Sequence, residues 1–399
     1  MSMNSTPQSE RIHIGIFGRT NSGKSSLINA MTGQEISIVS EIMGTTTDPV
    51  SKSMEILPLG AVTIFDTAGL DDTTTLSSQR IARTMDILRK TDIVLLVCES
   101  ESELCECEKA LLQQAKGLDL NIIIVLNKSD IQAPNKKWEA TAKEYSASLI
   151  SVSSLEKTGI NELKELIAVQ KGSGSGRVLI SDLVHAGDVC ILVVPIDSSA
   201  PKGRLILPQQ QVIRELIECG ASALVTRDTE YESVLKNIIR PALVITDSQV
   251  FGSISTQTPD DILLTSFSIL FARYKGNLDA LSAGAKAVDT LKPGNRVLIS
   301  EGCTHHRQCE DIGTVKIPKW LTEYTKCELD FSFTSGGTFP DDLSSYSLIV
   351  HCGGCMLNER EMKYRLQKAN AEHVPIINYG ILIAHINGIL KRSLIPFCK

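Results

Sequence analysis

Two short segments near the carboxyl end of this 399-residue chain are rich in residue types that bind metals. The first contains Cys303 and His305, and the second, well downstream, contains His351, Cys352 and Cys355. Two cysteines at C-x-x-C spacing can direct both thiolates at one metal centre, and a third cysteine from elsewhere adds another soft donor. Three thiolates favour zinc or an iron–sulfur cluster, whereas the C-x-x-C segment alone could also be a redox pair or a tight turn.

In a four-iron cluster, three cysteines leave one iron to a histidine, water or an exchangeable ligand. His305 is the leading protein candidate because it lies two residues from Cys303 and neutral imidazole binds iron. Equally, His305 could donate a hydrogen bond to a cysteine sulfur. We expect His351 to support the site rather than bind the metal, because it precedes Cys352 on a strand and should face the other way.

A glycine-rich segment near the amino end has the spacing of a phosphate-binding loop. Residues 12–17 predict a buried strand, which runs directly into the G-x-x-x-x-G-K-S segment 18–25. The glycines let backbone N–H groups close around phosphate oxygens, and the following helix directs its positive end at them. Lys24 is expected to reach the β- and γ-phosphates, and Ser25 to supply its hydroxyl to Mg²⁺. The nucleotide-binding residues expected in this segment are Gly18, Asn21, Ser22, Gly23, Lys24, Ser25 and Ser26.

The strand predicted over residues 62–65 ends in a second nucleotide motif, D-T-A-G at 66–69. We expect the carboxylate of Asp66 near the metal ion and the N–H of Gly69 at the γ-phosphate. Leu70 follows, where Ras-like GTPases carry the glutamine that orients water. An apolar side chain cannot do that, so intrinsic hydrolysis is expected to be slow or to use another group.

The strand predicted over residues 121–126 ends in a third motif, N-K-S-D at 127–130. Guanine offers N1–H and its N2 amine as adjacent donors to one carboxylate, which adenine cannot do, so Asp130 indicates GTP rather than ATP. The asparagine is expected at the N7/O6 edge and the lysine along the ring. A later Ser-Ser pair fits the last base-contacting loop in a weaker form. The base-contacting residues expected here are Asn127, Lys128, Asp130, Ser153 and Ser154.

The segment G-T-T-T-D at 44–48, together with Asn21, resembles the tRNA-modification GTPase TrmE and its relatives. The resemblance implies a K⁺ ion in place of an arginine finger, bound with the help of Asn21, and Thr46 as the switch threonine that contacts Mg²⁺. The alternative for Asn21 is a simple turn former. The catalytic residues expected from these motifs are Lys24, Thr46, Asp66 and Gly69.

The composition is that of a globular protein without marks of a nucleic-acid or membrane protein. Hydrophobic residues make up 42% of the chain, charged residues 22%, and the net charge is −6. Apolar runs fall far short of the roughly 20 residues that cross a bilayer, and residues 1–11 lack the apolar core of a secretory signal. We therefore expect a cytoplasmic protein, with no nucleic-acid or membrane partner, whose 11 cysteines stay reduced.

The chain length predicts two or three domains, and the pattern of apolar runs predicts three α/β units. The middle unit carries no catalytic constellation and is interpreted as a module for self-association. In the third, strands predicted over 296–299 and 347–350 directly precede the two metal motifs, and sites of open α/β sheets form at such strand ends. The expected parts are a disordered amino terminus 1–10, a G domain 11–170, a flexible Gly-Ser linker 171–177, a dimerisation domain 178–268 and a cluster-binding domain 269–399.

Together, these motifs resemble one family. The segments C-T-H-H-R-Q-C at 303–309 and H-C-G-G-C-M-L-N at 351–358, on a chain with a TrmE-like G domain, look like HydF, the family of maturation GTPases of iron–iron (FeFe) hydrogenases. The resemblance covers residues 10–395 or so. It implies a P-loop GTPase domain, an α/β dimerisation domain and an α/β iron–sulfur cluster-binding domain.

The resemblance further implies a scaffold and carrier. A four-iron–four-sulfur cluster would be held by Cys303, Cys352 and Cys355. A di-iron precursor with CO, cyanide and an azadithiolate bridge would be assembled on the protein or delivered to it, and then passed to the apo FeFe-hydrogenase. The radical-SAM maturases HydE and HydG would be further partners, and the protein would form a homodimer or a higher homo-oligomer.

Two interpretations from other classes stay open at this point. One is a GTP-dependent iron–sulfur enzyme, for which the second and third units supply no obvious acid–base pair. The other is a zinc-stabilised regulatory GTPase that acts on tRNA, against which the acidic balance and the lack of a basic patch with aromatic residues count.

Overall fold

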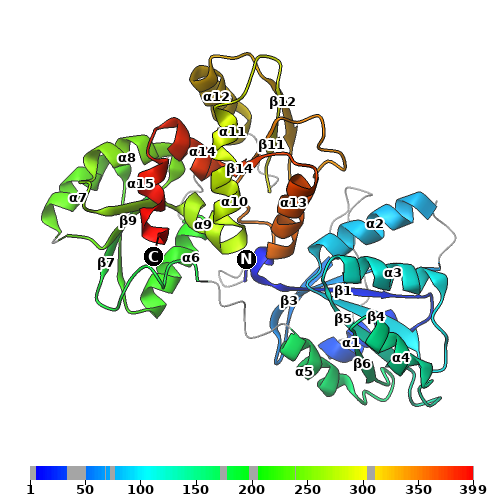
Figure 1. The fold of residues 1–399 in the computed structure, drawn as a ribbon. Coiled ribbons are helices and arrows are strands. Elements are labelled where there is room, and N and C mark those ends of the chain that lie inside the picture. Colours follow the sequence, from blue (N-terminus) through cyan, green and yellow to red (C-terminus); the bar gives the residue numbers. More distant parts are fainter. Residues whose placement is uncertain are drawn as a thin grey trace. The chain divides into compact units, whose positions relative to one another are not determined.

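The computed structural model of the chain describes residues 6–33, 51–67, 69–71, 77–170, 178–196, 205–238, 240–302 and 311–398, with residues 77–82 described as backbone only. The chain divides into two compact units, Met1–Gly176 and Arg177–Lys399. Figure 1 draws the first in blue to blue-green and the second in green to red. Both units are layered α/β structures, which confirms the predicted fold class.

The first unit is built on a six-stranded sheet with the order β2-β3-β1-β4-β5-β6. Only β2, at one edge, runs antiparallel to its neighbour; the other described strands are parallel. The strands are β1 (Ile12–Gly18), β2 (Ser51–Ile56), β3 (Gly60–Asp66), β4 (Ile93–Glu99), β5 (Asn121–Asn127) and β6 (Ser148–Ser151). The central strands are buried along nearly their whole length, as parallel strands covered on both faces are.

In the described part of this unit, five α-helices cover the two faces of the sheet. They are α1 (Lys24–Thr32), α2 (Ser77–Lys90), α3 (Glu106–Gly117), α4 (Lys137–Glu144) and α5 (Ile160–Gln170). One hydrophobic core contains side chains of α1 and α5, and a second contains side chains of α2, α3 and α4. Since the strands between the cores are parallel, their carboxyl ends meet at one edge of the sheet, where the three nucleotide motifs lie.

The second unit contains two four-stranded parallel sheets. The first has the order β10-β9-β7-β8, with β7 (Val189–Val193), β8 (Ser222–Thr226), β9 (Leu243–Thr246) and β10 (Leu263–Ser266). The second has the order β12-β11-β13-β14, with β11 (Arg296–Ser300), β12 (Asp330–Thr334), β13 (Leu348–His351) and β14 (Ile376–Asn378). The helices are α6 (Leu207–Glu218), α7 (Tyr231–Asn237), α8 (Phe251–Gln257), α9 (Phe267–Lys275), α10 (Leu278–Ala283), α11 (Ala285–Val288), α12 (Ile317–Thr325), α13 (Glu359–Ala371), α14 (Tyr379–Ile386) and α15 (Leu390–Leu394).

A common hydrophobic core joins the two sheets of the second unit. It contains Val244 of β9, Ile269 of α9, Ile299 of β11 and Val350 of β13. The boundary expected between residues 268 and 269 falls inside α9, whose side chains pack in this core. The strand β13, which leads into the predicted metal motif, is therefore supported by a helix from the preceding α/β segment.

Among the described residues, no helix combines the length and the apolar character that crossing a bilayer requires.

Candidate nucleotide site and cysteine loop

The phosphate-binding segment joins β1 to α1 and takes backbone conformations that favour glycine at both ends. Gly18 has a φ of +153° and Gly23 a φ of +93°. A Cβ on Gly18 would lie 2.3 Å from the carbonyl oxygen of Val97, and one on Gly23 would lie 2.2 Å from Nδ2 of Asn127. The helix then begins at Lys24, so its unpaired first-turn N–H groups lie at the end of the loop, an arrangement that binds phosphate.

The other predicted residues of this loop differ in exposure. Asn21, Ser25 and Ser26 are exposed, and Asn21 has a φ of +64°. Asparagine tolerates this left-handed conformation better than most residues, which suits its alternative role as a turn former. Ser22 is buried, and its hydroxyl has no hydrogen-bond partner within the described part of the chain.

Lys24 carries its positive charge into the loop. Its ammonium group donates hydrogen bonds to the carbonyl oxygens of Gly18 at 3.1 Å and Arg19 at 2.8 Å. Burial lowers the pKa of Lys24, while the carboxylates of Asp66 and Asp71 act in the opposite direction. Burial raises the pKa of Asp66, and the nearby Lys24 opposes that shift. Lys24 and Asp66 therefore lie close enough for each to favour the charged form of the other.

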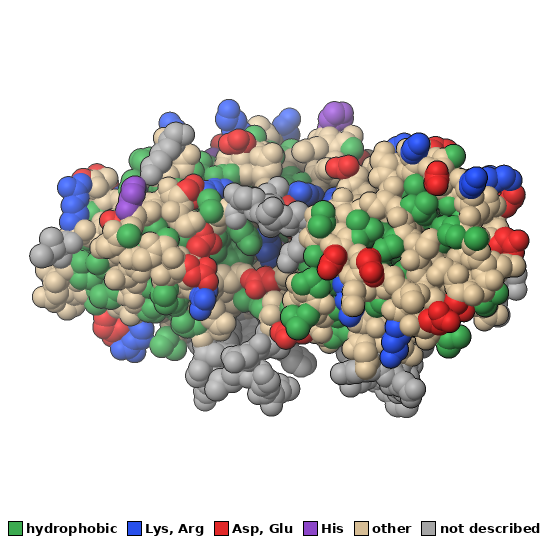
Figure 2. Space-filling view, turned by 90° about the horizontal axis from the view of Figure 1, so that it is seen from below, with side chains coloured by type: hydrophobic (Ala, Val, Ile, Leu, Met, Phe, Trp, Pro, Cys, Tyr) green, Lys and Arg blue, Asp and Glu red, His purple; other side chains and the backbone are tan. Residues whose placement is uncertain are grey.

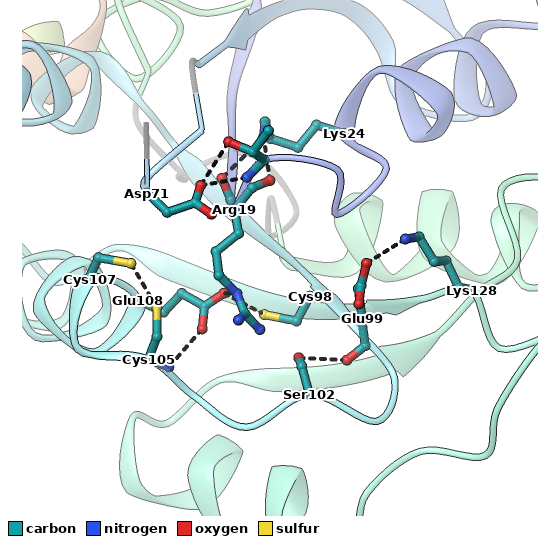
Figure 3. A network of polar contacts seen from close by, with 12 residues as sticks. Arg19, Lys24, Asp71, Cys98, Glu99, Ser102, Cys105, Cys107, Glu108 and Lys128 are labelled. Carbon is teal, nitrogen blue, oxygen red and sulfur yellow. Dashed lines mark hydrogen bonds and ion pairs between the residues drawn. The ribbon is translucent and has the colours of Figure 1, made fainter. Parts of the chain in front are cut away.

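Asp71, which the sequence motifs do not include, ties the segment after β3 to the phosphate loop (Figure 3). Its Oδ1 accepts hydrogen bonds from the backbone N–H of Thr20 at 2.6 Å and from the Thr20 hydroxyl at 2.9 Å. The N–H of Thr20 above all lowers the pKa of the Asp71 carboxyl. Gly69 is confined by the same contact, because a Cβ there would lie 2.3 Å from Oγ1 of Thr20. Leu70 donates its N–H to the Gly18 carbonyl at 3.1 Å, and its side chain, 7% exposed, packs in the core beside α2 to α4.

A buried carboxylate supports the other side of the phosphate loop. Glu108 of α3 accepts a hydrogen bond from Nε of Arg19 at 3.2 Å and another from the backbone N–H of Cys105 at 3.0 Å. The thiol of Cys98 also points to Glu108, with 3.6 Å between sulfur and oxygen, and the Sγ atoms of Cys105 and Cys107 lie 2.7 Å apart (Figure 3). Burial raises the pKa of the Cys98 thiol well above its usual value and that of Cys105 to about 12, so both thiols are neutral at physiological pH.

Four of the five predicted base-contacting residues, all except Ser153, line one pocket with residues of α1. The pocket has a volume of about 500 Å³. Its walls include Ser26, Asn127, Lys128, Asp130 and Ser154. Asp130 is exposed, and Lys128 pairs with the carboxylate of Glu99 across the strand ends. The pocket thus brings together segments that lie about a hundred residues apart along the chain.

Asn127 hydrogen-bonds two of the loops at this pocket, a role that the sequence motif does not reveal. Its side chain is 2% exposed, and its Nδ2 donates to the carbonyl oxygen of Ser22 at 3.1 Å. Its Oδ1 accepts from the N–H of Ser154 at 3.1 Å and from the Ser154 hydroxyl at 2.9 Å. The side-chain amide of Asn127 therefore connects the phosphate loop to the loop that contains Ser154. Ser153 beside it is fully buried and pairs its backbone with Thr158.

The cysteine loop follows β13, next to the end of β11. The N–H of Cys352 donates to the carbonyl oxygen of Ser300 at 3.0 Å. The Cys352 sulfur accepts two backbone N–H groups, from Gly302 at 3.0 Å and from Gly354 at 3.4 Å. Gly354 has a φ of +62°, and a Cβ there would lie 2.7 Å from Sδ of Met362, so the turn requires glycine. Burial raises the pKa of the Cys355 thiol, and Cys352 adds to that shift.

Three predicted site residues, Thr46, Cys303 and His305, lie outside the described residues. Gly302 directly precedes Cys303 in the sequence, and its N–H bonds the Cys352 sulfur. Within the described residues, no group of three or more histidine, cysteine or acidic side chains is arranged to hold a metal ion. Cys352 and Cys355 are the two predicted cysteine ligands that the described part of the chain includes.

His351 is the last residue of β13, and its side chain is fully buried. Its Nε2 lies 3.0 Å from Nη1 of Arg365, and its Nδ1 lies 2.7 Å from the carbonyl oxygen of Cys352. A guanidinium group only donates, so Nε2 accepts, and Nδ1 carries the hydrogen that is donated to Cys352. Both ring nitrogens therefore have protein partners.

Arg365, a fully buried arginine of α13, was not among the residues predicted for the site. It donates to Glu361 at 2.9 Å, to the Ser300 hydroxyl at 3.1 Å and to the carbonyl oxygen of Gly336 at 2.8 Å, besides His351. A guanidinium can be buried at low cost only when such partners exist. The i,i+4 spacing of Glu361 and Arg365 is the one signal in the sequence, and it also describes many exposed helical pairs.

Comparison with protein families gives three matches. A model described as the hydrogen maturase F dimerization domain matches residues 179–276, and one described as the hydrogen maturase F tetramerization domain matches residues 279–396. A model described as a 50S ribosome-binding GTPase matches residues 13–128. The two hydrogen maturase F models together match more than half of the chain.

The curated relatives include GTPase Der of Wolinella succinogenes, which is 36% identical over 184 residues, 43% of this chain and 38% of that protein. The tRNA modification GTPase MnmE of Bacillus subtilis is 31% identical over 176 residues, 43% of this chain and 37% of that protein. The chain thus spans less than two fifths of the length of either relative. Among solved structures, the G domain of the T. maritima FeoB iron transporter matches 40% of this chain and 99% of its own, at 23% identity and a TM-score of 0.32.

Replacing Asn127 by alanine should destabilise the first unit. The Asn127→Ala variant leaves the buried carbonyl of Ser22 and the N–H of Ser154 without their partner, which should cost about 1–3 kcal/mol. Urea unfolding of the nucleotide-free protein, followed by fluorescence of Trp138 in a Trp320→Phe background, measures this loss.

The matched control for this prediction is Lys137→Ala, which removes an exposed ion pair with Glu103 and should leave the unfolding midpoint close to that of the parent. Equal midpoints for the Asn127 variant and this control would show that the hydrogen bonds of Asn127 do not stabilise the first unit.

Proposed function

Because the chain belongs to the hydrogen maturase F family, we propose that it is a GTP-hydrolysing scaffold that carries a di-iron precursor to apo FeFe-hydrogenase. The scaffold holds a four-iron–four-sulfur cluster in its second unit. The observation that carries the proposal is the sulfur of Cys352, which accepts two backbone N–H groups where β11 and β13 end. On the same chain, the first unit has a phosphate loop and a pocket lined by residues predicted to contact guanine.

The donor set of the second unit fits an iron–sulfur cluster. Thiolates are its usual ligands, and N–H bonds to the sulfur stabilise the thiolate form. Cys352 and Cys355 would bind from one turn, and Cys303 from the end of the neighbouring strand, directly after Gly302. Once bound, the cluster supplies one iron with an exchangeable position, at which the di-iron cargo is carried. His305 or a water would occupy that position otherwise.

The first unit would bind GTP with Mg²⁺ at the edge where β1, β3 and β5 end. Lys24 would meet the β- and γ-phosphates, Ser25 and Thr46 would bind Mg²⁺, and Asp130 would select guanine. Leu70 offers no polar group to a water, which supports a cation-assisted mechanism with K⁺ near Asn21.

The partners follow from the proposed role. The segments matched by dimerization and tetramerization models support assembly of a homodimer or a higher homo-oligomer. The apo-hydrogenase would receive the cargo, and HydE and HydG would supply or build it.

A tRNA-related function is the alternative suggested by the likeness of the first unit to MnmE. On the face drawn in Figure 2, basic and acidic side chains are interspersed rather than gathered by sign. The phosphate backbone of a nucleic acid binds most strongly to a concentrated basic surface, so this face does not favour tRNA binding. The enzyme alternative likewise finds no support in the described cysteine loop, where His351 has partners at both ring nitrogens.

Asp130→Asn should exchange guanine for xanthine specificity, because the paired acceptor for N1–H and N2 is lost while xanthine offers a complementary carbonyl. Loss of hydrogen bonds to a charged group should weaken GTP binding about 10- to 100-fold. Titration with fluorescent GTP and XTP analogues measures both affinities.

Asp119→Asn is the matched control for the Asp130 variant, since Asp119 is an exposed residue that precedes β5, whereas Asp130 follows it. Unchanged GTP affinity in Asp130→Asn would remove Asp130 from the base site.

Replacing Na⁺ by K⁺ should raise GTP hydrolysis several-fold, and the Asn21→Gly variant should lose that difference. Glycine keeps the left-handed backbone at φ +64° and removes only the amide, so it separates ion binding from turn formation. Phosphate release at equal ionic strength is the measurement. K⁺ stimulation that persists in Asn21→Gly would leave Asn21 as a turn former.

Serine replacements of Cys303, Cys352 and Cys355 should lose most of the bound iron and all hydrogenase maturation. His305→Ala should keep the iron but change the electron paramagnetic resonance signal. Iron and zinc analysis with an anaerobic absorption spectrum measures the binding. Brown protein with about four irons per chain is expected for the scaffold.

Cys398→Ser is the control for these variants, because Cys398 is exposed and belongs to no ligand motif. Colourless protein that contains one zinc per chain would favour the regulatory GTPase instead. An unchanged resonance signal in His305→Ala would assign the fourth ligand to water or another side chain.

A further inference from the structure

A buried lysine from outside the cysteine motifs holds the cysteine loop. Lys275 is the last residue of α9, and its side chain is 3% exposed. Its Nζ donates to three backbone carbonyl oxygens, those of Gly354 at 3.2 Å, Cys355 at 3.1 Å and Leu357 at 3.0 Å. All three acceptors belong to the turn that contains Cys355 and follows Cys352.

These bonds hold the cysteine turn in place and compensate the buried charge of Lys275. An ammonium group has three N–H donors, and one short turn accepts three bonds from it. Burial of a charge is costly unless hydrogen bonds compensate it, and the three carbonyl oxygens of the turn supply that compensation. The last turn of a helix also favours a cation, because carbonyl dipoles point outward there. The ring of Phe271 lies 5.7 Å from Nζ and adds a further favourable contact.

Lys275 joins two parts of the chain that are matched by different family models. It lies in the segment matched by the dimerization model, whereas the turn lies in the segment matched by the tetramerization model. The two segments share the hydrophobic core of the second unit, which gives α9 a fixed position against β13. The packing of α9 in this core therefore fixes the position from which Lys275 bonds the turn.

We propose that Lys275 is a positioning residue for the cluster ligands, and that its buried positive charge favours the reduced state of the cluster. The proposal rests on the proposed function of the second unit. A four-iron cluster with a 2+ core and three cysteine thiolates has a net charge of about −1, and uptake of one electron makes it about −2. A fixed nearby cation stabilises the more negative state to a greater extent, and so raises the reduction potential.

Three replacements separate the contributions of the charge and of the hydrogen bonds. Lys275→Arg keeps the charge, Lys275→Gln keeps donors to the carbonyls without the charge, and Lys275→Met keeps neither. Each is made in the full-length protein and reconstituted anaerobically with iron and sulfide. Potentiometric titration with dithionite as the one-electron reductant, followed by electron paramagnetic resonance, gives the midpoint potential.

Lys275→Gln and Lys275→Met should shift the midpoint potential to more negative values, whereas Lys275→Arg should stay close to the parent. Lys368→Met is the matched control, since Lys368 is a half-buried lysine of the same unit that bonds the Asp341 carbonyl instead. Equal potentials in the parent and both neutral variants would overturn the role of the charge. If Lys275→Met does not fold, Lys275→Gln decides the question.

Hydrogen exchange in the cluster-free protein tests the positioning role without any metal. In Lys275→Met, the amides of residues 353–358 should exchange at least tenfold faster than in the parent, while those of β11 and β13 stay protected. Unchanged protection of the turn would overturn the positioning role. Parent protein that takes up no cluster would instead refute the proposed function, and the exchange result would still stand.

Discussion

Loops at the carboxyl ends of parallel strands lose the ladder partners of the strand, and their backbone groups must be satisfied in another way. Both candidate sites of this chain meet that constraint with side chains from distant segments. At the phosphate loop, Asn127 donates to the Ser22 carbonyl and accepts the N–H of Ser154. Asp71 accepts the N–H of Thr20. In the cysteine loop, the Cys352 sulfur accepts two N–H groups, and Lys275 donates hydrogen bonds to three carbonyl oxygens. The shape of each site depends on these contacts.

The two lysines that bond loop carbonyls differ in what surrounds them. Lys24 is partly buried, bonds two carbonyls of its own loop, and has the carboxylates of Asp66 and Asp71 nearby. Such a charge can exchange carbonyl partners for phosphate oxygens, because both are oxygen acceptors of similar reach. Lys275 is almost fully buried and bonds three carbonyls of a different segment. Leaving them would expose a charge to an apolar core, so Lys275 is suited to hold a structure and not to follow a ligand.

The sequence was sufficient for elements that rest on local patterns. Apolar runs at 121–126 and 296–299 end within one residue of β5 and β11, because buried parallel strands are continuously apolar and polar turns bound them. The edge strand β12 was missed, since its exposed residues break that pattern. The contacts of Asn127 with Ser22 and of Lys275 with the cysteine turn span 105 and about 80 residues, and no sequence period encodes such pairs. The motifs predicted the residue types of the sites, and the tertiary structure determines what supports them.

Support of this kind in the second unit would suit the proposed carrier of a metal cluster. A scaffold has to keep its cysteines in place while one coordination position changes its ligand. If only the metal bonds fixed the loop, every exchange would loosen it. Here the turn is fixed by Lys275, by the buried His351 and by the Cys352 N–H bond to Ser300, none of which would depend on the exchanging position of the proposed cluster. Since Lys275 extends from α9, the loop takes its position from the core shared by both sheets, and ligand exchange at the proposed cluster would not require this turn to unfold.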